Sequence, residues 1–417
     1  MKYFFPDSQD IVDPSFDFDR EDRSIERVRQ RDDQYAHEVF STPAYDGLLV
    51  SKGIVDGIKG SSGKYTLAQR HRLYRVGGRE FFRTRDLPII GDCGAFTYVR
   101  EEVPPYTVDE VLNFYNDCDF DLGISVDHVI LAYNQKFDYI KPSDNKEVTG
   151  HLERQNLTLQ LASEFLTTHK AGSLRFTPVG VAQGWSPNSY MVAVGALQDM
   201  GYDYIALGGM VPLKTKDILA CLEAIKEVRN PNTKLHLLGV TRIDSIPVFE
   251  NYGVASFDST SPLRQAFKDD RDNYYTLERT YTAIRVPQVS GNPKLLRNIS
   301  SGKLSQEIAR RMEQTALNTL QRFDLGKCEL EEVLDAVDSY DKFCDPQKNN
   351  REIYREVLTD SPWKNCPCDV CQHLGYHVIL FRGAERNRRR GFHNVWTFYR
   401  RLKSALGLVD GNNFSLS

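Results

Sequence analysis

Long apolar runs, a disulfide framework and an excess of positive charge are all missing from this sequence of 417 residues. No run approaches the roughly 18 consecutive apolar residues of a membrane-spanning helix, so we expect no membrane partner. Only eight residues are cysteine, and five of these are scattered singly, unlike the even framework of a secreted disulfide-rich protein. The formal net charge of −4 excludes a uniformly basic coat for nucleic acid but allows a local basic patch.

The first residues also differ from a secretion signal. The stretch "MKYFFPDSQDIVDPSFDFDRED" is acidic and broken by proline, whereas a signal peptide has a positive start and an apolar stretch. The sequence therefore predicts a cytoplasmic protein. Its length, with 41% hydrophobic and 26% charged residues, predicts one large domain with an appendage.

What the sequence does contain is a repeated alternation of short apolar runs and longer amphipathic stretches over residues 46–260. Continuous apolar strands alternating with helices are typical of a parallel sheet buried on both faces. Seven or eight such units favour a (β/α)8 barrel, with its eighth strand expected near 65–85. The predicted strands are "YDGLLVSK", "LPIIGDCG", "DLGISVDHVI", "RFTPVGVAQG", "YDYIALGG", "KLHLLGVT" and "VASFDS", and the predicted helices include 107–118, 150–172 and 214–230.

The pattern divides the chain into four segments. They are an N-terminal extension (1–45), the barrel (46–264), a charged helical insertion (265–350) and a C-terminal subdomain that ends in a helix (351–417). The stretch "GIKGSSGKY" (57–65) looks like a phosphate-binding loop. However, Ile58 and Tyr65 stand where glycine and a magnesium-binding hydroxyl belong, so we expect only a flexible loop.

Polar residues gather where the predicted barrel strands end, the part of such barrels that carries the chemistry. A single Asp there more often caps the next helix than takes part in catalysis. Several together predict an active-site rim. They are Asp92, Asp127, Gln183, Gly208, Gly209 and Asp258.

Three of the eight cysteines fall within the six residues "CPCDVC" (366–371). In a reducing compartment they stay thiols, and thiolates at this spacing suit Zn²⁺, which takes four tetrahedral ligands. His373 and His377 are candidates for the fourth ligand, but His373 lies too near the last cysteine. His393 can fold back from the following helix. Chance proximity is the alternative to a closed structural zinc site of Cys366, Cys368, Cys371 and His393.

A basic run, "FRGAERNRRRGFHNVWTFYRRLK", follows these cysteines. A charge run alone is as often a solvated helix face as a binding surface. Its position beside the cysteines favours contacts with nucleic-acid phosphates. The predicted contacts are Arg386, Arg388, Arg389, Arg390 and Arg400.

Taken in order, these motifs resemble those of the tRNA-guanine transglycosylases, over about 46–264 and 362–406. The matching stretches are "DCGAF", "SVDHV", "VAQG", "ALGGM", "LLGV", "FDSTSPLR" and the cysteine motif followed by "HN". The resemblance implies that Asp258 is the nucleophile and Asp92 the general acid and base. It also implies that Phe96 and Leu238 sandwich the base, that Asp127, Gln183, Gly208 and Gly209 read its edge, and that Arg264 meets a phosphate.

Elementary chemistry agrees with those roles. Breaking an N-glycosidic bond builds positive charge on the sugar, which a carboxylate below C1′ can trap covalently. A second carboxylate can give a proton to the departing purine and take one from the incoming base. The alternative is that both carboxylates merely bind a cation.

The sequence departs from the tRNA enzymes at Ala95, at Thr97, in "GGMVPLK" and in the long tract after Asp258. It most resembles the DpdA-type DNA-guanine transglycosylases. That resemblance implies exchange of guanine in DNA for a 7-deazaguanine, typically 7-cyano-7-deazaguanine, on a flipped or single-stranded nucleotide. Accessory DNA-modification proteins are potential partners. The alternatives are a tRNA enzyme and a catalytically silent binding subunit, and the presence of both Asp92 and Asp258 argues against the latter.

Overall fold

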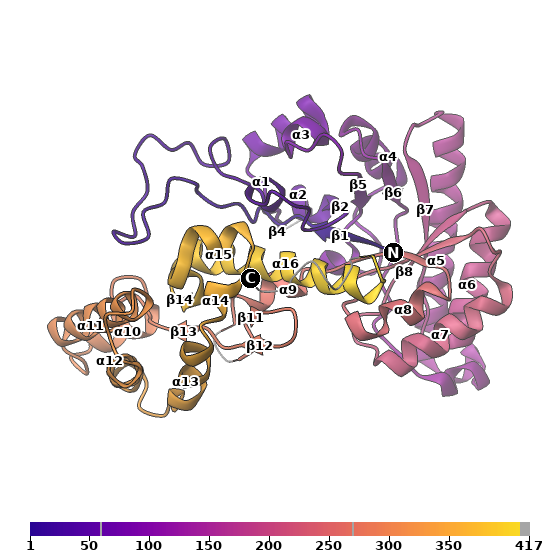
Figure 1. Ribbon diagram of the computed structural model, residues 1–417. Helices are drawn as coiled ribbons and strands as arrows, with labels where there is room; N and C mark the ends of the chain where they lie inside the picture. The colour runs from indigo at the N-terminus through magenta and orange to yellow at the C-terminus, as the bar shows by residue number, and fades with distance from the viewer. Residues whose placement is uncertain (59–60, 269–270, 409–417) are drawn as a thin grey trace. The chain divides into compact units, whose positions relative to one another are not determined.

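A closed barrel of eight parallel strands forms the centre of the first of two units in the chain (Figure 1). The computed structural model describes residues 1–58, 61–268 and 271–408. The first unit comprises Met1–Gln9, Tyr45–Thr260 and Leu402–Ser417, and the second comprises Asp10–Ala44 and Ser261–Arg401.

The order of strands around the barrel is β1-β10-β9-β8-β7-β6-β5-β2, and every neighbouring pair is parallel. The predicted fold class, a (β/α)8 barrel, is therefore confirmed. The strands are β1 (Lys2–Pro6), β2 (Gly47–Ser51), β5 (Ile89–Asp92), β6 (Leu122–Ile124), β7 (Thr177–Ala182), β8 (Tyr204–Leu207), β9 (Lys234–Leu237) and β10 (Val254–Asp258).

The strand that closes the barrel is not where the sequence analysis expects it. Residues 65–85 hold a helix, α3 (Leu67–Phe81), which begins at a capping box between Thr66 and Gln69. The eighth strand is instead β1, within the segment assigned to the N-terminal extension. Its aromatic residues Tyr3, Phe4 and Phe5 are buried, and β-prone aromatic side chains let five residues form a strand despite acidic neighbours.

Helices connect the strands and lie around them (Figure 1). The three helices predicted at 107–118, 150–172 and 214–230 are all present. Side-chain caps fix several starts: Thr107 accepts a hydrogen bond from the backbone of Glu110, and Ser186 accepts one from that of Ser189. The remaining bounds are α2 (Lys52–Val55), α4 (Val108–Asp117), α5 (Lys146–Ala171), α6 (Pro187–Met200), α7 (Thr215–Val228) and α8 (Ile246–Glu250), with 3₁₀ turns η1 (Ala95–Tyr98), η2 (Gln135–Tyr139), η3 (Pro142–Asp144) and η4 (Ile243–Ser245).

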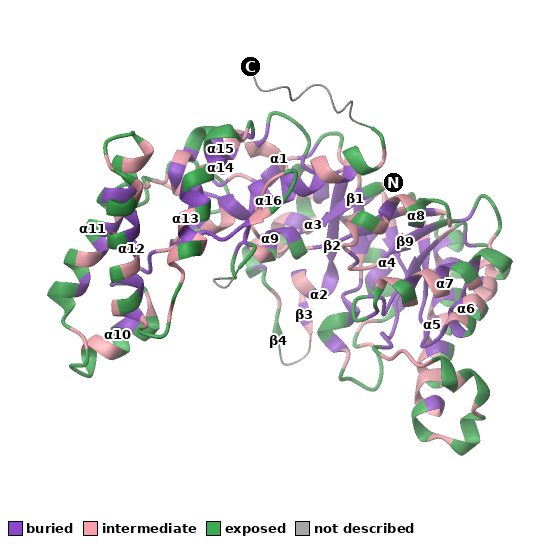
Figure 2. Ribbon diagram, turned by 60° about the horizontal axis from the view of Figure 1, so that its bottom comes forward, coloured by how far each residue is buried: buried purple, intermediate pink, exposed green. Residues whose placement is uncertain are grey.

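The barrel interior is filled by side chains and is not a channel. Its apolar cluster comprises Phe4, Leu49, Ile90, Ile124, Val179, Val181 and Ala206, and the strands are buried along most of their length (Figure 2). Each fully buried large side chain contributes about 1.5–3 kcal/mol. This rigid core fixes the strand ends.

The segment predicted to be a flexible loop, 57–65, contains the short antiparallel pair β3 (Gly57–Ile58) and β4 (Ser61–Ser62). Residues 59 and 60 lie outside the described residues.

The second unit is mostly helical. Its N-terminal part carries α1 (Ala36–Val39) and two isolated bridges, Val12 with Gln34 and Asp17 with Asp22. The other elements are α9 (Ser261–Gln265), β11 (Tyr274–Tyr275), β12 (Thr280–Tyr281), β13 (Ile284–Arg285), α10 (Pro293–Ser300), α11 (Gln306–Asp324), α12 (Leu330–Cys344), α13 (Arg351–Asp360), α14 (Pro362–Asn365), α15 (Asp369–Leu374), η5 (Gly375–Ile379), β14 (Leu380–Phe381) and most of α16 (Gly383–Ala405).

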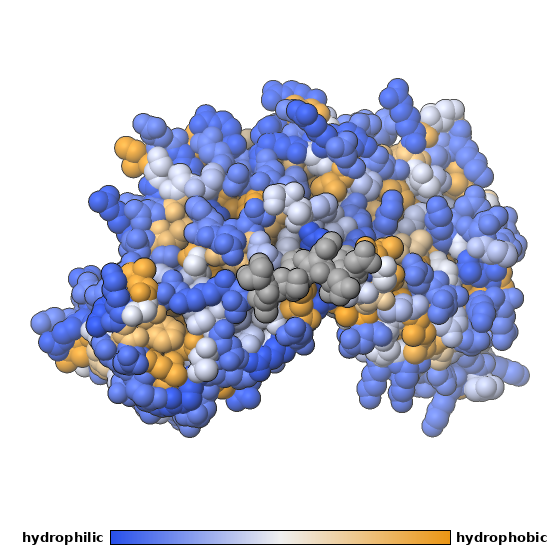
Figure 3. All heavy atoms as spheres, viewed as in Figure 1, coloured by the Kyte–Doolittle hydropathy of each residue, from blue (hydrophilic) through white to orange (hydrophobic). Residues whose placement is uncertain are grey.

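Hydrophilic residues predominate on the face drawn in Figure 3, where apolar side chains form small separate groups. Among the described residues, we find no helix that combines the length and apolarity needed to cross a membrane.

Candidate active site and metal cluster

Six consecutive barrel strands, β5 to β10, bring the predicted site residues to one end of the barrel. Asp92 is the last residue of β5, and Asp258 is the last residue of β10. The other predicted residues directly follow strand ends or lie within a few residues of them. They are Phe96, Asp127, Gln183, Gly208, Gly209 and Leu238.

Asp92 lies in an environment that favours its protonated form. Its Oδ2 accepts a hydrogen bond from the backbone N–H of Gly94 at 3.0 Å. Burial, followed by the negative charges of Asp127 and Asp258, raises the pKa of Asp92 to about 7. A carboxyl group that titrates near neutral pH can both give and accept a proton, as a general acid and base must.

Asp258 is 8% exposed and is held through one oxygen. Its Oδ1 accepts the backbone N–H of Gly239 at 2.9 Å and lies 3.2 Å from Nε2 of His236. Within the described residues, Oδ2 of Asp258 accepts no such bond. This free oxygen suits a nucleophile, because its lone pairs are not engaged.

A buried hydrogen-bond network surrounds Asp127. Its Oδ1 accepts the thiol of Cys93 at 3.1 Å, and its Oδ2 accepts the Gln183 side-chain amide at 2.6 Å. The Gln183 carbonyl oxygen in turn accepts the backbone N–H of Ile130 at 3.1 Å. Burial raises the pKa of Asp127 although both hydrogen bonds lower it. Such a paired carboxyl and amide can recognise the donor and acceptor edge of a planar heterocycle.

Glycine at positions 208 and 209 lets the backbone pass close to its neighbours. A Cβ on Gly208 would lie 2.1 Å from Nε2 of Gln183, and one on Gly209 would lie 2.4 Å from the Ile130 carbonyl oxygen. Gly209 also has a φ of +71°, in the left-handed region. The Tyr190 hydroxyl donates to the Gly208 carbonyl at 2.7 Å. The backbone therefore approaches Gln183 closely and is rigidly held there.

The two predicted stacking residues differ in exposure. Phe96, on η1 shortly after β5, is 52% exposed. Leu238 follows β9 and is partly buried against the barrel core.

The four predicted metal ligands come together in the second unit. The thiol sulfurs of Cys366, Cys368 and Cys371 lie 3.7, 3.3 and 3.3 Å from Nδ1 of His393. The four ligand atoms all lie within 4.8 Å of one another, so the cluster can bind a metal ion.

Neighbouring residues fix the orientation of His393. Its Nε2 lies 2.6 Å from the Tyr275 carbonyl oxygen, which can only accept, so Nε2 carries the hydrogen and Nδ1 faces the three sulfurs. The Tyr274 ring stacks on the imidazole with a centroid distance of 4.2 Å. Such support is typical of a metal-ligating histidine.

The predicted phosphate contacts divide by burial. Arg386, Arg389 and Arg390 are 3%, 4% and 0% exposed. Each donates to a group inside the second unit: Arg386 pairs with Glu21, Arg389 donates to the Asp13 carbonyl, and Arg390 donates to the carbonyls of Leu380 and Ala266. We therefore withdraw these three from the predicted contacts. Arg264 is exposed, whereas Arg388 and Arg400 are half-buried.

The site also contains residues that the sequence analysis does not single out. Cys93 supports Asp127, and His236 supports Asp258. A usable signal exists for His236, because it is a polar residue between two leucines of a predicted strand and lies two residues from Leu238, on the same strand face. Cys93 gives no such signal in the sequence, because cysteine is among the residues most often buried in protein cores.

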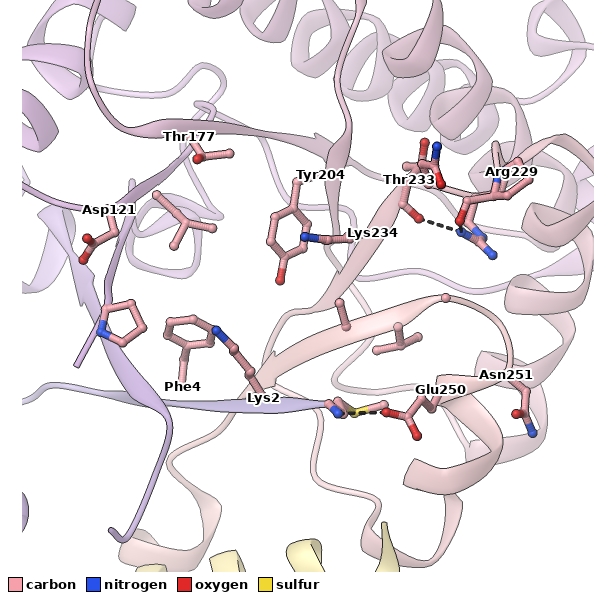
Figure 4. A pocket seen from close by; sticks show the side chains of 18 residues that line it. Lys2, Phe4, Asp121, Thr177, Tyr204, Arg229, Thr233, Lys234, Glu250 and Asn251 are labelled. Atoms are coloured by element: carbon pink, nitrogen blue, oxygen red, sulfur yellow. Dashed lines mark hydrogen bonds and ion pairs between the residues drawn. The ribbon is translucent and has the colours of Figure 1, made fainter. Parts of the chain in front are cut away.

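A separate pocket of about 1020 Å³ opens at the other end of the barrel (Figure 4). First residues of strands line it, among them Lys2, Leu122, Tyr204 and Lys234. None of the predicted site residues lines this pocket, so the two ends of the barrel are chemically distinct.

Comparison with known proteins gives one informative relative. No protein-family model matches the chain. The chain is 50% identical over 416 residues to a DNA-guanine transglycosylase from Salmonella montevideo, and the match covers 98% of each protein.

Proposed function

This chain belongs to the family of the DNA-guanine transglycosylases, and from that premise we propose that it exchanges guanine in DNA for a 7-deazaguanine base. Membership of this family makes it a base-exchange transglycosylase, an enzyme of the pentosyltransferase type. The proposal extends this to the polymer, the incoming base and the residues that act. The single observation that carries it is the pair of carboxyls at strand ends: burial raises the pKa of Asp92, and Asp258 is held through one oxygen only.

The first half of the proposed reaction removes guanine. Oδ2 of Asp258 attacks C1′ of the flipped nucleotide, the C1′–N9 bond breaks, and its electron pair leaves with the purine. Protonated Asp92 gives its proton to the departing base. A covalent sugar ester of Asp258 remains, and Asp92 is left as a carboxylate.

The second half reverses these steps with another base. Asp92 takes the proton from the incoming 7-deazaguanine, whose N9 attacks C1′ as the bond to Asp258 breaks. Both carboxyls return to their starting forms, so the cycle needs no cofactor oxidation or reduction. Asp127, Gln183 and the backbone at Gly208 and Gly209 bind the edge of either base, with Phe96 and Leu238 across its faces.

We propose Zn²⁺ as the ion of the cysteine cluster. Tetrahedral zinc with ordinary Zn–S and Zn–N bonds places sulfur and nitrogen about 3.6 Å apart, and the observed separations are 3.3 to 3.7 Å. Three thiolates and one imidazole complete the four ligands, which leaves no open position. The ion would therefore stabilise the second unit and take no part in base exchange.

DNA contacts in this proposal come from Arg264, Arg388 and Arg400, which are not fully buried. Such contacts give an affinity that falls as salt rises. Cytoplasmic location and accessory DNA-modification proteins stay predictions from the sequence.

A base-exchange assay with purified protein tests the function. Labelled guanine or 7-cyano-7-deazaguanine is offered with plasmid DNA or with bulk tRNA, and Asp258→Asn serves as the control. Label in DNA alone, absent from the control, is the expected result. Label in tRNA would instead favour a tRNA enzyme. No label in either polymer, with zinc and folding intact, would favour the silent binding subunit.

A further inference from the structure

A chain of hydrogen bonds runs through the barrel interior to Asp258. The Tyr204 hydroxyl lies 2.5 Å from Oγ of Ser256, and this Oγ lies 2.6 Å from Nδ1 of His236. Nε2 of the same imidazole lies 3.2 Å from Oδ1 of Asp258. The residues come from β8, β9 and β10, and His236 and Ser256 are 0% exposed.

Strand register brings these groups together. His236 and Ser256 are direct partners across β9 and β10, and Ser256 and Asp258 lie two residues apart, on the same face of β10. The contacts are thus built into the sheet and do not depend on a loop. A polar group this deep in a barrel costs free energy unless it is fully hydrogen-bonded.

With a neutral His236 imidazole, the chemistry of each group sets the direction of every hydrogen bond. An ionised carboxylate only accepts, so Nε2 of His236 is the donor, and in the neutral imidazole Nδ1 is then the acceptor. The Ser256 hydroxyl therefore donates to Nδ1, and its oxygen accepts from the Tyr204 hydroxyl. Burial raises the pKa of Tyr204, which keeps this hydroxyl protonated as a donor. The neutral tautomer of His236 with its hydrogen on Nε2 is compatible with all three of these hydrogen bonds.

We infer that His236 is a positioning residue for base exchange, which with Ser256 and Tyr204 holds Oδ1 of Asp258 so that Oδ2 faces C1′. The inference rests on the proposed function, because it assigns a role relative to the nucleophile. Gly239 supplies the second donor to Oδ1 through its backbone N–H at 2.9 Å. Two donors on one oxygen select the other oxygen for attack.

The same two donors serve both halves of the reaction. In the covalent ester, Oδ2 is bonded to C1′ and Oδ1 becomes the carbonyl oxygen, which still accepts from His236 and Gly239. When the incoming base attacks, the electron pair of the C1′–Oδ2 bond returns to the carboxylate, and both donors stabilise the returning charge. Donors that are already in place need no reorganisation during either step.

Tyr204 makes this inference testable from outside the active site. Its side chain lines the pocket at the amino-terminal end of the barrel, beside Lys234 (Figure 4). The base-binding residues lie at the carboxyl end of the strands. A change at Tyr204 therefore alters the hydrogen-bond chain without touching a bound base.

The experiment measures kcat and KM for the incoming base, together with the single-turnover rate of covalent adduct formation. We expect His236→Phe to lower kcat and the adduct rate about 10- to 100-fold, with KM changed less than about threefold, since a hydrogen bond to a charged group is lost. His236→Gln, which keeps an N–H donor, should recover most of the lost rate. Tyr204→Phe should lower kcat about threefold to tenfold.

Tyr202→Phe is the matched control. The Tyr202 hydroxyl is also buried, but it donates to the Ala162 carbonyl at 2.7 Å and takes no part in the hydrogen bonds that lead to Asp258. Thermal unfolding shows whether each variant is folded. A purely structural role predicts equal effects of Tyr202→Phe and Tyr204→Phe on kcat, and that result would overturn the inference. So would wild-type kcat in folded His236→Phe while Asp258→Asn is inactive. Full activity of Asp258→Asn would instead overturn the proposed nucleophile.

Discussion

At the scale of single residues, Asp92 links catalysis to stability. Its pKa is raised to about 7 by burial and by neighbouring carboxylates, whereas the pKa of Asp in an unfolded chain is about 3.9. Between these values the folded protein binds more protons than the unfolded chain, so the contribution of Asp92 to stability falls as pH rises from about 4 to 7. Above pH 7, folding carries the full cost of a buried charge.

Replacement of Asp92 by Asn should therefore abolish exchange and yet stabilise the fold at alkaline pH. We expect a gain of roughly 2–4 kcal/mol in unfolding free energy at pH 8, which shrinks towards zero near pH 4. Urea unfolding of both proteins at several pH values measures this. A variant that is less stable than wild type at pH 8 would contradict the prediction.

Cys93 is the second residue whose role can be tested alone. Burial raises the pKa of its thiol, which stays protonated and donates to Asp127 at 3.1 Å. Cys93→Ala should weaken binding of the incoming base about tenfold, because an aligned donor to a buried carboxyl is lost. Cys93→Ser keeps a donor and should retain most affinity. Cys118→Ala removes another buried thiol and should leave base affinity unchanged in the same titration.

Gly208 tests the close approach of the backbone to Gln183. An added methyl would lie 2.1 Å from Nε2 of Gln183, so Gly208→Ala should displace the amide and raise KM for the base more than about tenfold. At Gly195, within α6, no atom beyond the chain neighbours and the helix's own backbone lies within 4 Å of an added Cβ. Gly195→Ala should therefore leave KM unchanged and raise thermal stability slightly. Equal KM values for the two variants would contradict this reading of the site.

At the scale of elements, the sequence predicts what is local and fails where partners are distant. Seven strands are recognisable because each is a continuous apolar run. β1 is missed because five residues beside an acidic stretch give no comparable signal. The predicted phosphate contacts include Arg386 of α16, yet Arg386, like Arg382 just before that helix, pairs with Glu21 more than 360 positions away. No spacing rule reveals such a pairing.

The cysteine cluster could be predicted from the sequence, because the close spacing of three cysteines already indicates a metal site. We expect one zinc per chain by mass spectrometry. Cys368→Ser should lower this below one and lower the midpoint of thermal unfolding, because a structural zinc contributes folding free energy directly. Cys328→Ser, which changes a thiol outside the cluster, should keep both values. Full zinc and unchanged stability in Cys368→Ser would exclude the proposed ligand set.

At the scale of the whole molecule, a protein of net charge −4 can hold DNA only through local cations. Three phosphate contacts, from Arg264, Arg388 and Arg400, predict a slope of about −2.7 for log affinity against log salt. Arg264→Ala should reduce the steepness by about one unit. Fluorescence anisotropy with a labelled duplex at four salt concentrations measures it.

The buried arginines of α16 should contribute to stability and not to DNA binding. Arg389 is 4% exposed and donates to the Asp13 carbonyl, so Arg389→Ala should lower the unfolding temperature and leave the salt slope of the folded protein unchanged. Arg322→Ala, at an exposed arginine paired with Glu332, controls for loss of one positive charge. If Arg389→Ala flattened the slope and Arg264→Ala did not, burial would be a poor guide to the DNA contacts of this molecule. Its basic helix would then have to open when it binds DNA.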